Sequence, residues 1–409
     1  MSKLFESNWT KTKEALCEGR DLLVNMDGTS NPNKKKTMET ILENTRQEML
    51  RRSPLMEHAT AGATAAGNVA TLNKVIMPVL RRVMPTVIAN EIIGVQPMTG
   101  PVAQIHTLRV RYADTTPAAG GGVTAGTEAL SPFDIAKYYS GNEDVARPGA
   151  APTAVLEGRP GNRLSIQILK ETVEVKTRRL SARWTFEAAQ DAQAQQGIDI
   201  EAEVMAALAQ EITAEIDQEI LTSLRRLPGA ATSTYDQANV SGTATFVGDE
   251  HAALAVLINR QANLIASRTR RGPGNWIVVS PTALTVLQSA TTSAFARTTE
   301  GVFEAPTNTK YVGTLNNSMR VYVDQYAPDN TPVLVGYKGQ GEIDAAAYYC
   351  PYVPLTSSGV VIDPQTFEPV VSFMTRYGYL ELTNSASSLG NAADYLGLVA
   401  IDTNNLKFL

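Results

Sequence analysis

Cysteine and histidine are scarce in this sequence of 409 residues, which holds two cysteines and three histidines. Cys17 and Cys350 lie far apart, so the chain is no disulfide scaffold and suits a reducing compartment. None of the histidines, His58, His106 and His251, belongs to an HExxH motif or to a Cys/His zinc spacing. We therefore expect no metal site of these types.

Long apolar runs and catalytic motifs are also missing. No run approaches the roughly 18 apolar residues that a membrane helix needs, so no membrane span is expected. The N-terminus lacks an apolar segment of the kind that directs secretion. No GxxxxGK[ST], GxGxxG or GxSxG motif occurs. We therefore expect no bound cofactor and no enzymatic activity; an enzyme or a soluble binding module is the alternative class.

Positive charge is not in excess, because 36 Lys and Arg face 41 Asp and Glu, for a net charge of -5. Dedicated DNA-binding proteins usually carry a basic surplus, since phosphate contacts supply most of their affinity. Sequence-specific DNA binding is therefore not expected. Hydrophobic residues make up 43% of the chain, which is enough to bury a sizeable core.

The N-terminal residues differ in composition from those that follow. Residues 1–57 are rich in charges of both signs, and a short amphipathic helix is predicted over Thr37–Leu50, before Pro54. Residues 58–72 are mostly Ala, Gly and Thr, which indicates an extended arm. His251 falls in the first turn of another predicted helix, where we expect it at the surface.

Residues 113–163 are unusual, because 23 of these 51 residues are Ala, Gly or Pro. Compact domains seldom hold so long a loop without structure of its own. Alternating strand patterns flank it at Leu108–Tyr112 and Leu164–Ile168. The pattern favours an arm that becomes ordered against another subunit.

The strongest periodic signal is a run of seven apolar residues at intervals of four, which predicts a long helix ended by Pro228-Gly229. Because an α-helix has 3.6 residues per turn, this stripe winds about 40° at each step and contacts different elements along its length. We call it the spine helix. Its packing residues are Ile200, Val204, Leu208, Ile212, Ile216, Ile220 and Leu224.

After residue 240 short strands and helices alternate. WIVVSPTALTVL predicts a strand, a cap at Ser280, Pro281 in the first helical turn, and a helix. Further strands are predicted at RVYVD, PVLVGYK and Val370–Leu382, and a polar tail follows.

Three long phrases can be compared with a known family: VMPTVIANEIIGVQPMTGPVAQIHTLRVRY, LSARWTFEAAQDAQAQQGIDIEAEVMAALAQEITAEID and YYCPYVPLTSSGVVIDPQTFEPVVSFMTRYG. In the same order they resemble the major capsid proteins of T4-like tailed bacteriophages, over about residues 55–380. The resemblance implies an α+β, HK97-type capsid fold. Its expected parts are 1–57, an N-terminal assembly segment or propeptide; 58–112, the N-arm and the start of the peripheral domain; 113–163, the extended loop; 164–240, the peripheral domain with the spine helix; 241–345, the axial domain; and 346–409, return strands and C-terminal tail.

The function implied by the resemblance is structural. The protein would assemble into homo-pentamers and homo-hexamers of an icosahedral head shell, enclosing double-stranded DNA without sequence-specific binding. Implied partners are a scaffold protein, a prohead protease, a portal, and vertex or decoration proteins. It would assemble in the bacterial host cytoplasm and remain in the virion. Alternatives are a vertex protein that forms only pentamers and an encapsulin-like compartment shell.

Two further expectations concern processing and size. In the resembled family a prohead protease cuts after Glu in a Leu/Ile-x-Glu context, and Leu55-Met56-Glu57 fits this pattern at the start of the arm. Ile41-Leu42-Glu43 also fits but lies inside the predicted helix. The T4-type protein carries an extra domain in the extended-loop region, and residues 113–163 are too few to hold it.

Overall fold

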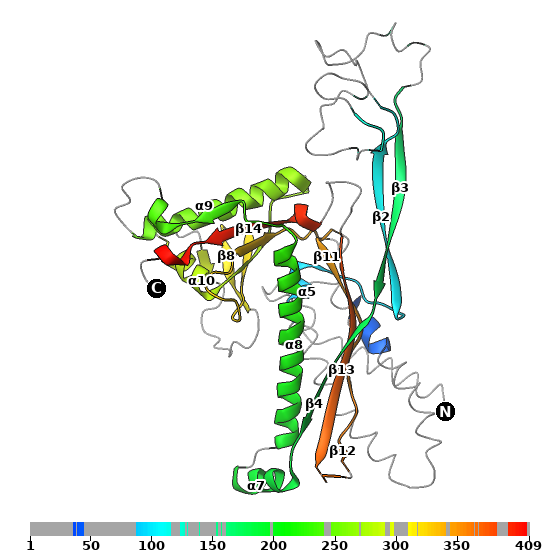
Figure 1. Cartoon of the computed structure of the whole chain (residues 1–409), viewed down its shortest axis with the longest axis vertical. Coiled ribbons are helices and arrows are strands. Elements are labelled where there is room, and N and C mark those ends of the chain that lie inside the picture. Colours follow the sequence, from blue (N-terminus) through cyan, green and yellow to red (C-terminus); the bar gives the residue numbers. More distant parts are fainter. Residues whose placement is uncertain are drawn as a thin grey trace.

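Two sheets, a long helix and a projecting hairpin make up the computed structural model of the chain (Figure 1). It describes residues 36–37, 39–44, 87–115, 123–126, 129, 139, 153, 157, 161–196, 199–240, 247–269, 271–290, 295–297, 310–316, 318–340, 344–363, 365–366, 368–382 and 392–406. Helices and strands are mixed rather than alternating in one sheet, so the expected α+β class is confirmed.

The first sheet is elongated and centred on β13 (Pro369–Glu381). One edge of β13 pairs antiparallel with β4 (Lys176–Arg183). Its other edge pairs with β11 (Ala347–Ser357) and then with β12 (Val361–Ile362). β1 (Gly94–Val95) adds a short parallel strand beyond β11.

The helix α8 (Ile200–Arg226) lies along this sheet, and α7 (Phe186–Gln196) precedes it (Figure 1). Local signals fix its ends, since the Asp199 side chain accepts a hydrogen bond from the Glu201 amide. Acidic residues occupy its first turn and basic residues its last, which complements the helix dipole. Gly229, with a φ of 74°, then turns the chain away.

The second sheet has seven strands in the order β5-β14-β10-β6-β9-β8-β7. They are β5 (Ser233–Tyr235), β14 (Leu396–Ile401), β10 (Val333–Gly336), β6 (Trp276–Val279), β9 (Met319–Val323), β8 (Lys310–Leu315) and β7 (Phe295–Arg297). Helices α9 (Val247–Thr269) and α10 (Pro281–Ser289) pack beside it. The predicted Ser280 cap is confirmed, because its hydroxyl accepts from the Ala283 amide.

This sheet extends beyond the range 241–345 that the sequence suggested for one domain. β5 lies before that range and β14 lies in the C-terminal part, yet both belong to the same sheet. β14 also lies next to β10 in the interior of the strand order. The C-terminal residues therefore include a buried strand in addition to a polar tail.

One hydrophobic core joins α8 to both sheets. It includes Ile212 and Leu224 of α8, Phe373 of β13, and Trp276 and Tyr322 of the second sheet. The short helix α5 (Ala89–Ile92) is buried in the same core. The two sheets and the long helix are thus packed as one body.

Candidate assembly surfaces

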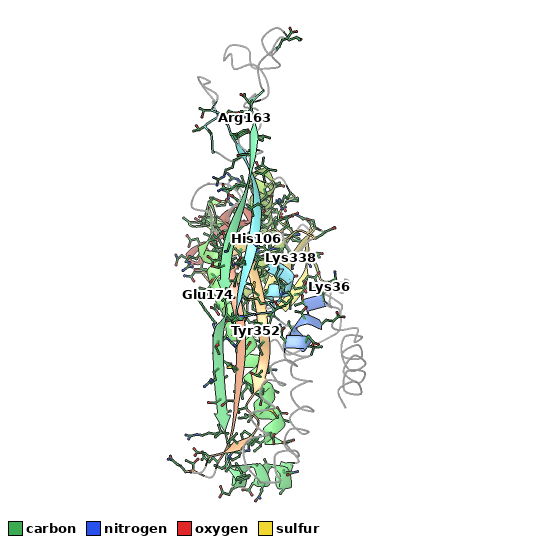
Figure 2. All side chains as sticks on the ribbon, turned by 90° about the vertical axis from the view of Figure 1, so that its right-hand side faces the viewer. Lys36, His106, Arg163, Glu174, Lys338 and Tyr352 are labelled. Atoms are coloured by element: carbon green, nitrogen blue, oxygen red, sulfur yellow. The ribbon has the colours of Figure 1, made fainter. Side chains whose placement is uncertain are left out.

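The hairpin β2–β3 leaves the body as a two-stranded ribbon (Figure 1). β2 (Val102–Tyr112) and β3 (Leu164–Glu174) pair without a register shift along all of their 11 residues. Arg163 lies near its far end, while His106 and Glu174 lie closer to the body (Figure 2). An extended ribbon of this length reaches roughly 35 Å.

The outer half of this ribbon has an apolar face that is largely exposed on its β3 side. Leu164, Ile166 and Ile168 alternate along β3, with exposed fractions of 54%, 68% and 66%. Across the ladder, Tyr112 pairs with Leu164 and Val110 with Ile166, so these partners share the same face. Because an isolated hairpin is only marginally stable and large apolar patches seldom stay in water, this face is typical of an interaction surface.

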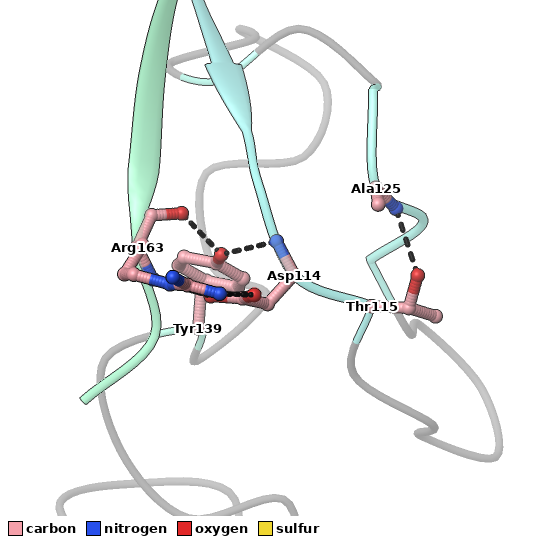
Figure 3. A network of polar contacts seen from close by, with 5 residues as sticks. All are labelled: Asp114, Thr115, Ala125, Tyr139 and Arg163. Carbon is pink, nitrogen blue, oxygen red and sulfur yellow. Dashed lines mark hydrogen bonds and ion pairs between the residues drawn. The ribbon is translucent and has the colours of Figure 1, made fainter. Parts of the chain in front are cut away.

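A cluster of polar side chains closes the far end of the ribbon, where the strands stop (Figure 3). The Arg163 guanidinium donates to both carboxylate oxygens of Asp114, at 3.0 and 3.3 Å, and its backbone amide donates to the same group at 2.8 Å. These hydrogen bonds lower the pKa of Asp114. The Tyr139 hydroxyl donates to the Arg163 carbonyl and accepts from the Asp114 amide. Asp114 and Arg163, at the two ends of the 113–163 segment, are thereby linked to each other and to Tyr139.

The spine-helix stripe lies mostly against the core. Leu208, Ile212, Ile216, Ile220 and Leu224 are buried. Val204 is partly buried and packs against the main core, and Ile200 at the first turn is half-buried. The residues that follow several stripe positions, such as Ala209 and Leu221, are buried too, which widens the apolar face.

A charged network ties the spine helix to the first sheet. Arg178 of β4 donates to Glu215 and Glu219 of α8, at 2.6 and 2.5 Å, and to the Tyr377 hydroxyl of β13 at 2.6 Å. Tyr377 in turn donates to Glu219. Burial by itself would raise the pKa of Glu219, but the hydrogen bonds from Tyr377 and Arg178 hold it below its ordinary value.

A second polar cluster ties the spine helix to the second sheet. Asp324, whose side chain is fully buried, accepts from Arg225 at 2.9 Å and from Gln218 at 2.7 Å. On β9, Arg320 pairs with the buried Glu91 of α5 at 3.4 Å. The Lys338 ammonium donates to the Asn90 carbonyl at 2.8 Å. The second sheet is therefore held to both α5 and α8 by largely buried polar contacts.

Asp217 is the most perturbed acid of the spine helix. Its Oδ1 accepts from the Ile88 backbone amide at 2.9 Å, and its Oδ2 has no partner among the described residues. Burial raises the pKa of this carboxyl to about 8, and the nearby Asp324 acts in the same direction. The neutral form is therefore the one that fits this position at neutral pH.

The remaining site expectations have different outcomes. Leu55, Met56 and Glu57 lie outside the described residues, so the processing site stays a prediction. The expectation for His251 was wrong, because its side chain is buried and its Nδ1 pairs with the Ser289 hydroxyl. Asp217 was not predicted as a site residue. The sequence signal for it is that the residues after the neighbouring stripe positions are small or apolar, namely Met205, Ala209, Thr213 and Leu221, whereas Asp217 is an acid in the same row.

The described residues also bear on metal binding, thiol chemistry and membrane insertion. In the described ranges no group of three or more His, Cys, Asp or Glu side chains could hold a metal ion. Cys350 is a buried free thiol, and burial raises its pKa to about 12, which suppresses thiolate reactivity. Among the described helices, none is both long and apolar enough to cross a membrane.

A projecting apolar hairpin on a well-packed body is typical of a subunit of a larger assembly. Comparisons with known proteins agree with this class. The family described as Major capsid protein Gp23 matches residues 69–401. The chain belongs to this family, whose members are structural subunits of the tailed-phage head shell and components of the virion. The vertex-protein and encapsulin-like alternatives are not favoured.

Individual relatives carry the same name. The major capsid protein of Vibrio phage KVP40 is 30% identical over 497 residues, covering 94% of this chain and 95% of that protein. The major capsid protein of Enterobacteria phage T4 is 30% identical over 402 residues, with 78% and 77% coverage. Because 497 exceeds the 409 residues of this chain, the KVP40 protein has residues with no counterpart here.

Solved phage structures show more distant likeness. The structure titled as the capsid of Myoviridae phage XM1 is 12% identical, covers 76% of this chain and 90% of that chain, and has a TM-score of 0.42. A chain from Microbacterium phage Oxtober96 is 10% identical, with 77% and 90% coverage and a TM-score of 0.43.

Proposed function

We propose that the chain assembles into homo-pentamers and homo-hexamers of an icosahedral head shell that encloses double-stranded DNA. Membership in the major capsid protein family supports this, and the uncovered apolar face of hairpin β2–β3 carries it. In the proposed HK97-type arrangement, residues 113–163, which connect β2 to β3, form the extended loop. Residues 164–240 form the peripheral domain, and residues 241–345 contribute most of the axial domain.

The apolar face requires a partner surface on physical grounds. Ile166 and Ile168 are each about two-thirds exposed, on a ribbon that pairs with no further strand among the described residues. Covering such side chains contributes about 25 cal/mol per Å² of apolar surface removed from water. In a closed shell every hairpin has a neighbouring copy of the chain beside it, and this copy is the partner that we propose for the apolar face. Each subunit would then cover the hairpin of its neighbour.

The other partners follow from this role. The net charge of -5 suits a shell that encloses DNA without binding its phosphates tightly. A scaffold protein, a prohead protease and a portal are the proposed assembly partners, with vertex or decoration proteins on the finished shell. We propose that the subunit itself performs no chemistry. It would assemble in the bacterial host cytoplasm.

Processing is proposed at Glu57. Leu55-Met56-Glu57 stands between the charged N-terminal residues and the arm rich in small residues, where an extended chain can enter a protease. Residues 1–57 would serve assembly and then be removed. Changing Glu57→Ala should leave the full-length chain in particles made with the protease present, as measured by intact mass. Trimming of this variant at residue 57 would refute the assignment.

Paired substitutions on the hairpin test the shell function. Ile166→Asp places a charge on the apolar face, whereas Gln167→Asp places the same charge on the adjacent residue, which points to the opposite face. Co-expressed with the scaffold and examined by negative-stain electron microscopy, the Ile166 variant should give folded subunits without closed shells. The Gln167 variant should give shells in wild-type yield.

The yield of closed shells distinguishes the shell function from the alternative classes of protein. Normal shells from the Ile166 variant would refute the role of the apolar face. If the wild-type chain gives only uniform small particles under every condition, including with the scaffold present, the shell function is refuted. An enzyme or a soluble binding module would then be the favoured class. Circular dichroism of the soluble variants establishes that both remain folded.

A further inference from the structure

A short helix from the N-terminal segment is seated on the body of the same chain. Residues 36–37 and 39–44 are helical, and Ile41 and Leu42 are almost fully buried. We call residues 36–37 and 39–44 the N-terminal helix. In Figure 2, the helical turn labelled at Lys36 lies beside the strand layer that carries Tyr352. Burial of adjacent apolar residues shows that the helix is packed rather than standing free in water.

The contact that fixes this helix is made by Asn44. Its side-chain amide donates one hydrogen bond to the Met98 carbonyl at 2.7 Å and another to the Tyr352 carbonyl at 3.0 Å. Both N–H groups of the amide are thereby used, and the residue is only 7% exposed. One side chain joins two backbone segments that are far apart in sequence.

The two carbonyls lie where a parallel ladder ends. After β1 the chain continues along β11, with the Gln96 amide donating to the Tyr349 carbonyl and the Met98 amide to the Pro351 carbonyl, both at 3.0 Å. The Asn44 amide then bonds the Met98 carbonyl and the Tyr352 carbonyl, one from each segment. It therefore extends the ladder by a side-chain bridge.

This junction also supports the base of the hairpin. Met98 and Tyr352 share a buried cluster with Ile105 of β2 and Val173 of β3. The packing is close, since a Cβ on Gly378 of β13 would lie 2.4 Å from Val173 Cγ1. A change in the Asn44 contact thus reaches residues that set how the hairpin leaves the body.

We propose that the N-terminal helix is an intramolecular latch, in which Asn44 holds the β1–β11 junction closed and steadies the base of hairpin β2–β3. Displacing the N-terminal segment frees two buried carbonyl acceptors and loosens that base. The latch goes beyond the shell function, because it is a property of the single subunit.

The latch has a consequence for processing. Ile41-Leu42-Glu43 matches the same short pattern as the site at Glu57, but proteases bind their substrates as extended chains. With Ile41 and Leu42 buried in a seated helix, this second site is shielded. This consequence alone rests on the proposed processing.

Hydrogen exchange of the full-length, unassembled subunit tests the latch. Asn44→Asp turns a donor into an acceptor facing two carbonyls, and Asn44→Leu keeps the branched shape at Cγ but removes both hydrogen bonds. In both variants, exchange of the amides of residues 39–44, Gln96 and Met98 should accelerate roughly tenfold or more, while that of α8 stays at the wild-type rate. Thr40→Ala is the matched control, because the Thr40 hydroxyl bonds only the Lys36 carbonyl within the same helix.

Two results would overturn the latch. Unchanged exchange of the Gln96 and Met98 amides in both Asn44 variants would show that the bridge does not hold the junction. Equal acceleration of α8 would show a general loss of stability instead of a local release. Because exchange is measured before assembly and shells are counted separately by microscopy, failure of the latch and failure of the shell function are distinguishable.

Discussion

Asp217→Asn should stabilise the subunit at neutral pH and have little effect in acid. The asparagine keeps a side-chain oxygen to accept from the Ile88 amide, which the carboxyl now binds at 2.9 Å. Asparagine is neutral at every pH, so folding no longer requires the Asp217 carboxyl to take up a proton. Burial raises the pKa of that carboxyl to about 8. The substitution is nearly isosteric, so the packing around the spine helix is preserved.

The sign and size follow from proton linkage. The unfolded chain releases the Asp217 proton above its ordinary pKa of 3.8, whereas the folded chain keeps it until about pH 8. The unfolded state binds fewer protons in this window, so wild-type stability falls as pH rises through it. The slope approaches about 1.4 kcal/mol per pH unit, which amounts to about 4 kcal/mol at pH 7 as an upper estimate.

Urea denaturation of the unassembled subunit at pH 5, 6 and 7 measures this difference. The gain in unfolding free energy of Asp217→Asn over wild type should grow with each pH step. Ile216→Val, one residue away on the same helix, is the control, because it should cost about 1 kcal/mol at every pH. A gain for Asp217→Asn that is the same at all three pH values would refute the reasoning.

Two further substitutions test packing and polar contacts. Gly336→Ala places a methyl group 2.1 Å from the Trp276 ring, so it should cost about 3 kcal/mol or more or prevent soluble expression; wild-type urea stability would contradict this. Tyr377→Phe removes the hydroxyl that Arg178 and Glu219 share, and should lower the unfolding free energy by about 1–2 kcal/mol. An unchanged urea midpoint would show that this network does not contribute to stability.

The spine helix was predictable because its signals are local. The interval of four, the Asp199 side chain before the first turn and Pro228-Gly229 after the last define a helix within two residues of Ile200–Arg226. The Ser280 cap followed by Pro281 was equally clear. Such features depend on neighbours in the sequence and need no knowledge of the fold.

Long-range pairings could not be predicted in this way. Strand patterns marked both sides of the 113–163 segment, but nothing in them showed that β2 and β3 pair along their whole length. The Asn44 bridge joins residues 54 and 308 positions away, and the Ile88 contact of Asp217 spans 129. An acid among the small and apolar residues that follow the stripe positions indicates a buried polar contact without identifying its partner.

The shared core has a mechanical consequence. Because α8 packs against both sheets in one hydrophobic cluster, the body resists bending as a unit. The hairpin, by contrast, is a ribbon of two strands and can twist or bend at small cost. In the proposed pentamers and hexamers, copies would meet at different angles, and the strain of closing a curved surface would concentrate in the ribbon. Stiffness in the body and compliance in the hairpin would let one sequence occupy unequal positions.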